Sequence, residues 1–205
     1  MTNIRVVVVG LALVALAQPM STDAGQGVIA GGVVAATTIE SRTEMSGAAA
    51  VAFRVNRLAS VGVEVTLVPT LKPDVAALDQ STLIASNGSA SGTSGRATIF
   101  TTNARIEIPR TSRIIPYVIA GGGVANVKES FTITVPVPVP PGIPVVIPPR
   151  PVTQSSTDLA LMAGGGLSIF ATGHFSIDVD ARYIRLVADR DLNIGRFGIG
   201  LGYRF

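Results

Sequence analysis

Few residues of this chain are suited to acid–base or metal chemistry. His174 is the only histidine, and the chain contains no cysteine. A hydrolytic triad or a histidine-based metal site needs partner side chains, and the sequence supplies no second histidine and no thiolate. His174 follows Gly173 in a predicted short turn, so we interpret it as a solvated turn residue. The sequence therefore predicts no enzymatic activity, no metal site and no cofactor.

Charged side chains instead recur at every second position of predicted strands. In 175–187, the apolar residues Phe175, Ile177 and Val179 alternate with polar residues, including Asp178 and Asp180. Eight charged residues share such polar faces: Arg54, Glu64, Arg105, Glu107, Asp178, Asp180, Arg182 and Arg204. Both signs occur, so these residues can form a salt-bridge network inside a narrow barrel, whose interior must be filled by side chains. An ion pathway is the alternative interpretation, and the small interior of such a barrel favours the network.

Eight runs of alternating hydropathy predict the strands that position these residues. The runs are 27–39, 47–56, 61–69, 96–108, 114–128, 158–170, 175–187 and 194–205. The connections after the second, fourth and sixth runs are four or five residues long, whereas 70–95 and 129–157 are long. Short periplasmic turns and longer outer loops are typical of an up-and-down barrel in an outer membrane, with both chain ends in the periplasm.

The composition agrees with strands that face lipid. Hydrophobic residues make up 47% of the chain and charged residues 14%, and the mean hydropathy is +0.50. A spanning helix needs about 20 consecutive apolar residues, and only the N-terminus approaches that length. The hydrophobicity is therefore spread over many short segments, as in a membrane barrel. The 16 basic and 13 acidic residues form no basic stripe, so no nucleic-acid partner is expected.

The first 17 residues have the pattern of a cleaved signal peptide. Arg5 provides the positive charge, an apolar run follows from Val6, and Ala15 and Ala17 form an A-x-A cleavage site. This run is too short for a retained membrane anchor, which is the alternative. We expect Sec-dependent export, removal of residues 1–17 and a mature barrel over 18–205.

The C-terminal sequence resembles a known targeting signal. Gly200, Tyr203 and Phe205 match the glycine and the aromatic-x-Phe ending of outer-membrane proteins, although Gly198 stands where that signal usually has a polar residue. The glycine-rich segments 121–123 and 164–166 resemble the central strands of small barrels in the outer-membrane β-barrel superfamily. The resemblance implies a location in the bacterial outer membrane, contact with its lipid, insertion by the barrel assembly machinery, and no cofactor.

The segment 135–152 contains most of the thirteen prolines. Alternating valine and proline favour an extended polyproline conformation over a strand ladder. We interpret the segment as a stiff outer loop, with contact to a surface partner as the alternative.

Together these features predict an all-β fold, an eight-stranded antiparallel up-and-down transmembrane β-barrel. The expected function is a non-enzymatic structural or surface-interaction role in the cell envelope. Two alternatives remain: a narrow porin-like channel for ions or small solutes, and a soluble secreted barrel that holds a ligand.

Overall fold

The computed structural model describes residues 27–39, 42–71, 89–108, 113–134, 150–187 and 192–205. These residues form eight strands: β1 (Gly27–Ile39), β2 (Arg42–Arg54), β3 (Ala59–Leu71), β4 (Ser89–Glu107), β5 (Ile114–Thr134), β6 (Arg150–Phe170), β7 (Phe175–Val187) and β8 (Leu192–Arg204). The predicted signal peptide, 1–17, lies outside the described residues. Within the described chain, no helix is long and apolar enough to cross a membrane.

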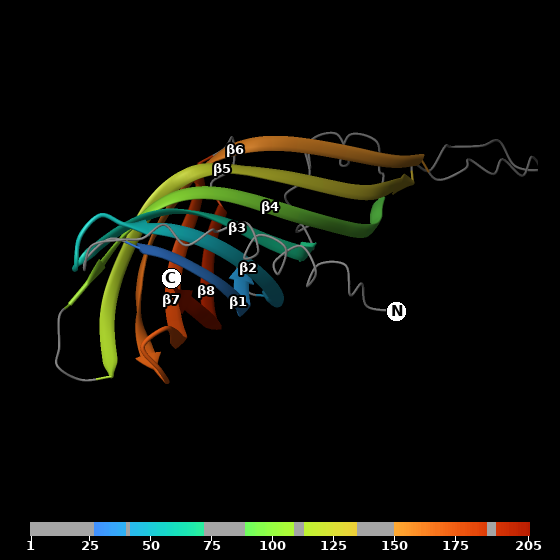
Figure 1. Cartoon of the computed structure of the whole chain (residues 1–205). Coiled ribbons are helices and arrows are strands. Elements are labelled where there is room, and N and C mark those ends of the chain that lie inside the picture. The colour runs from blue at the N-terminus through green and yellow to red at the C-terminus, as the bar shows by residue number, and fades with distance from the viewer. Residues whose placement is uncertain (1–26, 40–41, 72–88, 109–112, 135–149, 188–191) are drawn as a thin grey trace, which may run out of the picture.

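The strands close into one antiparallel barrel in chain order. Closure is made by β1 and β8, which pair from Ile29↔Arg204 to Ile39↔Ile194. The amide of Phe205 adds a further hydrogen bond to the carbonyl of Val28, at 3.0 Å. The predicted fold class, an eight-stranded antiparallel up-and-down barrel, is thereby confirmed (Figure 1).

Along each strand, polar residues tend to face the barrel interior and apolar residues face outward, as a lipid surrounding requires. On β7, Ser176, Asp180 and Arg182 are buried, whereas Phe175 and Ile177 are exposed. On β8, Phe197 and Leu201 are 58% and 64% exposed. Similar exposed apolar side chains occur on every strand. A soluble protein rarely exposes so large an apolar surface, whereas a barrel in a bilayer needs it.

The strands extend further than hydropathy alternation predicts. β2 begins at Arg42, five residues before the predicted run 47–56, and β4, β5 and β6 run into the segments predicted as the long loops 70–95 and 129–157. Serine and threonine dominate the added residues, and their backbones still pair, as in Ser94↔Ser130. Outside the hydrocarbon no apolar face is required, so a strand can continue without alternation. Residues 72–88 and 135–149 lie outside the described part of the chain.

The added residues form a three-stranded projection, which we call the β4–β6 extension. It comprises 89–94 of β4, 129–134 of β5 and 150–157 of β6, and it runs beyond the ends of the neighbouring strands (Figure 1). β3 reaches β4 only as far as Leu71↔Gly95, and β7 reaches β6 only as far as Leu159↔Val187. The extension lies at the end of the barrel opposite the C-terminus.

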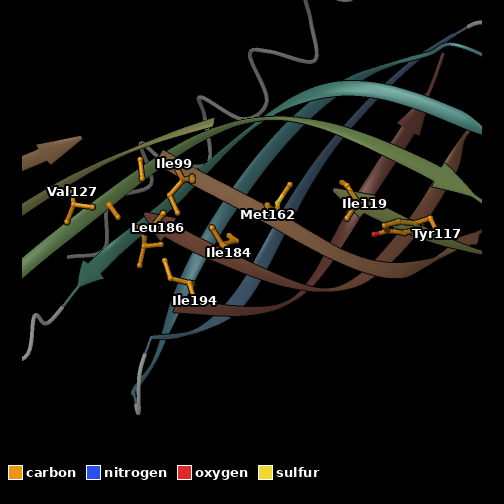
Figure 2. Close-up of a cluster of buried hydrophobic side chains, with 12 residues drawn as sticks. Ile99, Tyr117, Ile119, Val127, Met162, Ile184, Leu186 and Ile194 are labelled. Atoms are coloured by element: carbon orange, nitrogen blue, oxygen red, sulfur yellow. The ribbon is translucent and has the colours of Figure 1, made fainter. Parts of the chain in front are cut away.

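A packed apolar core fills the half of the lumen next to the extension. Ile99, Ile184, Leu186 and Ile194 come from β4, β7 and β8 and are each 1% exposed. Figure 2 shows these side chains gathered together, with Met162 from β6 beside them. The alternating charges in the sequence predict a charged interior, and this apolar core was not predicted. Isoleucine and leucine are also the residue types expected on the lipid-facing side, so their presence in a strand does not indicate an apolar interior.

Two inward-facing glycines allow larger side chains to lie flat against the wall. A Cβ on Gly166 would clash with the carbonyl oxygen of Val179 and lie 2.7 Å from Cζ and from the hydroxyl of Tyr117. A Cβ on Gly164 would clash with the carbonyl oxygen of Ala181 and lie 2.9 Å from Cγ of Arg182. Both distances are too short for non-bonded atoms. These glycines therefore provide the space that Tyr117 and Arg182 occupy.

We predict that Gly166→Ala will destabilise the barrel by about 1–3 kcal/mol, the usual cost of overpacking. The matched control is Gly173→Ala, because a Cβ on Gly173 meets nothing within 4 Å. Urea titration of the refolded protein, with the folded fraction read from its heat-modifiable gel mobility, measures the difference. Equal midpoints for the two variants would contradict the assigned role of Gly166.

Candidate functional site

The interior charges form two clusters. The central cluster joins Glu64 of β3 to Asp180 and Arg182 of β7 and Arg196 of β8. The Arg182 guanidinium donates to the Glu64 carboxylate and, through Nη2 at 2.7 Å, to Oδ2 of Asp180. Arg196 Nη1 donates to Glu64 Oε1 at 2.7 Å and to Thr66 Oγ1 at 2.8 Å. Two cations and two anions make this cluster neutral, and its charged side chains are at most 6% exposed.

The second cluster lies nearer the C-terminal end of the barrel and is centred on Glu107. The Glu107 carboxylate pairs with Arg54 at 3.2 Å, with Arg105 at 3.0 Å and also with Arg204. Arg105 further pairs with Asp178 at 3.6 Å. Three cations against two anions leave this cluster with one excess positive charge.

Aromatic rings cover two of these arginines. The Arg105 guanidinium lies 3.7 Å from the ring centroid of Tyr117, and that of Arg204 lies 4.2 Å from the centroid of Phe170. Cation–π contacts of this kind are attractive where a cation is shielded from water. They hold the guanidinium planes against the barrel wall, with the donors directed at carboxylates.

The clusters connect strands that are distant in sequence. Glu64 is separated from Arg182 by 118 residues and from Arg196 by 132. Removing one partner of a buried ion pair costs about 3–5 kcal/mol, because the other charge is left without compensation. The pairs therefore tie opposite walls of the barrel together across its lumen.

All eight charged residues singled out by the sequence lie in these two clusters. Sequence reasoning omitted Arg196, although that residue has no exposed side-chain surface and pairs with Glu64. The available indication was its position: it shares the inward face of 194–205 with Gly198, Gly200 and Arg204. Sequence reasoning also missed Ser168, which accepts a hydrogen bond from Arg105 and donates one to Asp178.

A small cavity lies beside the clusters. Its volume is about 60 Å³, and small residues of β1 and β2 form one wall: Gly31, Ala48, Ala50 and Ala52. Three buried polar atoms without a partner belong to residues that line it: Ser60 Oγ, Arg105 Nε and Asp180 Oδ1. The space suits a few water molecules and is well below the roughly 300–1,000 Å³ of small-molecule sites.

The targeting residues Tyr203 and Phe205 lie in an aromatic group at the C-terminal end of the barrel. Tyr203 packs edge-on against Phe175 and Phe205, with ring centroids 4.9 and 4.7 Å apart. Gly200, the third targeting residue, is buried and faces the lumen. Aromatic side chains of this kind are enriched at the membrane–water boundary.

His174 lies in the turn between β6 and β7 and is exposed. Its ring stacks on Tyr203 at a centroid distance of 6.0 Å, and its backbone amide donates to Thr172 Oγ1. Among the described residues, no three histidine, aspartate or glutamate side chains are grouped so as to hold a metal ion.

Solved structures of other proteins share this architecture. The chain superposes on neisserial surface protein A with a TM-score of 0.57 and 16% identity, covering 90% of this chain and all of that one. A major outer membrane protein from Thermus thermophilus gives 0.57 and 14%, covering 87% and 99%. Ail, the attachment invasion locus protein of Yersinia pestis, gives 0.53 and 16%, covering 90% and 100%. At such identities these likenesses show the fold alone.

A comparison with curated proteins finds no match. A comparison with models of protein families does identify a family. The family model described as the outer membrane protein beta-barrel domain matches residues 7–205, which include every described strand. The chain belongs to the outer membrane protein β-barrel domain family and is a bacterial outer-membrane β-barrel.

Proposed function

We propose that this protein is a non-enzymatic outer-membrane barrel with a structural or surface-interaction role, whose lumen does not conduct ions. The observation that carries the proposal is the apolar core across the lumen. Ile99, Ile184, Leu186 and Ile194 are each 1% exposed, and they come from opposite parts of the barrel wall. An ion passing between them would lose its hydration shell without gaining a polar partner, which costs many kcal/mol.

The charged half of the lumen supports the same function. Each carboxylate of the two clusters is paired with at least one arginine, so no carboxylate is left without a cation. The competing function, a narrow channel, would require mobile water along the whole axis. The cavity of about 60 Å³ lies beside the charged clusters, and the apolar core lies between those clusters and the β4–β6 extension.

The orientation we propose places both chain ends in the periplasm, after export and removal of residues 1–17 and insertion by the barrel assembly machinery. The β4–β6 extension then stands outside the cell, with exposed polar residues such as Gln154 and Ser155. It also carries the proline-rich segment predicted over 135–152, of which Pro151 and Val152 pair with β5 as part of β6 instead of forming a polyproline loop. A surface partner for the segment stays a prediction, because residues 135–149 lie outside the described residues.

The structural part of the role rests on the central cluster. Glu64 is the only carboxylate there that bonds both Arg182 and Arg196 closely, and it connects β3 to β7 and β8. A barrel fixed in this way is a rigid support for the extension.

We predict that the refolded full-length protein will produce no stable single-channel steps in planar bilayers. A large general porin, reconstituted in the same bilayers, provides the positive control for insertion and detection. Reproducible steps that scale with salt concentration would contradict the non-conducting role and favour the channel.

We predict that Glu64→Gln will lower the free energy of unfolding by about 3–5 kcal/mol, because two buried arginines lose their shared carboxylate. Urea titration by gel mobility measures this loss. Arg57→Gln, at an exposed turn residue, is the control and is expected to change stability by less than about 0.5 kcal/mol.

The double variant Glu64→Gln/Arg196→Gln tests the assignment of the pair. We expect it to lose less stability than the sum of the two single variants, because the residues share one interaction. Additive losses would show that Glu64 and Arg196 act independently.

A further inference from the structure

We propose that Arg96 and Lys128 form a binding site for the phosphorylated headgroup of a lipid in the outer leaflet. The proposal rests on the outward orientation of the β4–β6 extension. Arg96 of β4 and Lys128 of β5 are direct cross-strand partners. Their neighbours Ala97 and Val127 are buried in the lumen, so Arg96 and Lys128 point away from it, and both are exposed.

The two cations lie just above the lipid-facing band. On the same outer face, Phe100, Val124 and Leu159 are adjacent in register and about half exposed, and they form the last apolar row before the extension. Polar residues follow at once, with Thr98 paired to Asn126. The apolar band therefore ends at the row of Phe100.

The height of the cations fits the headgroup layer. Arg96 lies four positions before Phe100, which is about 13 Å along a strand. A strand tilt of roughly 40° reduces this to about 10 Å along the membrane normal. Long arginine and lysine side chains also reach toward the headgroups along the surface. The phosphates of the outer leaflet are thus within reach of both side chains.

The two neighbouring positive charges of Arg96 and Lys128 favour binding of an anion. Like charges directly opposite each other on neighbouring strands are destabilising. Neither Arg96 nor Lys128 makes an ion pair within the described part of the chain. The nearest outward-facing positions hold hydroxyl and amide side chains instead: Ser94, Thr98, Asn126, Ser130 and Ser155. A phosphate between the two cations would remove their repulsion and gain charge-assisted hydrogen bonds.

The position of the site selects a lipid over a soluble anion. The cations face sideways from the barrel wall, and the lipid-facing row of Phe100, Val124 and Leu159 continues directly below them. A lipid bound there places its acyl chains on that row and its phosphate between the cations. A soluble phosphate would use only the second of these contacts.

The test measures binding of fluorescent lipid A, carrying both phosphates, to refolded full-length protein in maltoside micelles. We expect Arg96→Gln/Lys128→Gln to weaken binding on the order of tenfold or more, because each cation at an anionic lipid surface contributes substantially. The matched control is Arg57→Gln/Arg113→Gln, which removes two exposed cations at the opposite end of the barrel and should leave binding unchanged. Equal losses in the two double variants, or no loss in the first, would overturn the proposal.

Three further measurements keep the test specific. The charge-conserving Arg96→Lys/Lys128→Arg should retain binding, which separates loss of charge from misfolding.

Lipid A stripped of its phosphates should bind the native protein as weakly as it binds Arg96→Gln/Lys128→Gln. Equal binding of the two lipids to the native protein would overturn the proposal. Millimolar inorganic phosphate should not displace lipid A, and complete displacement would instead indicate a soluble anion. Conductance is not involved in any of these readouts, so a channel activity would leave their outcome intact.

Discussion

The structure depends on one constraint, the need to pair every backbone donor and acceptor where no water is present. In hydrocarbon a sheet can meet this need only by closing on itself. The pairing of β1 with β8 provides that closure, and the bond from Phe205 to Val28 extends it to the last residue. Closure with eight strands leaves a narrow lumen, so side chains must fill it. The interior of this protein follows from that requirement.

The lumen is filled by two different kinds of contact. Toward the extension, Ile99, Ile184 and Ile194 pack without polar partners. Toward the C-terminal end, arginines pair with carboxylates, and Tyr117 and Phe170 cover two guanidinium groups. Large side chains fit because their neighbours are small. Gly164 leaves space for Arg182 and Gly166 for Tyr117, while alanines of β2 leave the small cavity opposite. Glycine in these strands is therefore a packing residue.

The sequence was sufficient for the fold and for most of the charged interior. Alternation of hydropathy shows which face of a strand meets lipid, and an isolated charge on the other face must then point inward. This reasoning puts Glu64, Asp180 and Arg182 on the inward face, and in the structure all three are buried. Alternation also puts Ile184 and Leu186 on the inward face, in the row of Asp180 and Arg182. Their apolar type, however, is the one expected on the lipid-facing side, so the sequence gives no sign that the charged interior ends in an apolar core. Alternation also puts Arg196 on the inward face of 194–205. Its pairing with Glu64, 132 residues away in the sequence, is what no local pattern shows.

The boundaries of the membrane can be located from the same rows of side chains. The outward-facing apolar row of β8 runs from Phe197 to Phe205, and that of the β4 wall runs from Phe100 to Ile108. Both rows span nine residues, and a tilted strand needs about 9–11 to cross the hydrocarbon. The strands β4, β5 and β6 are much longer than this, so their remaining residues belong to water and headgroups. Those residues resemble loops in the sequence because their hydropathy does not alternate. The alternation stops where the strands leave the hydrocarbon.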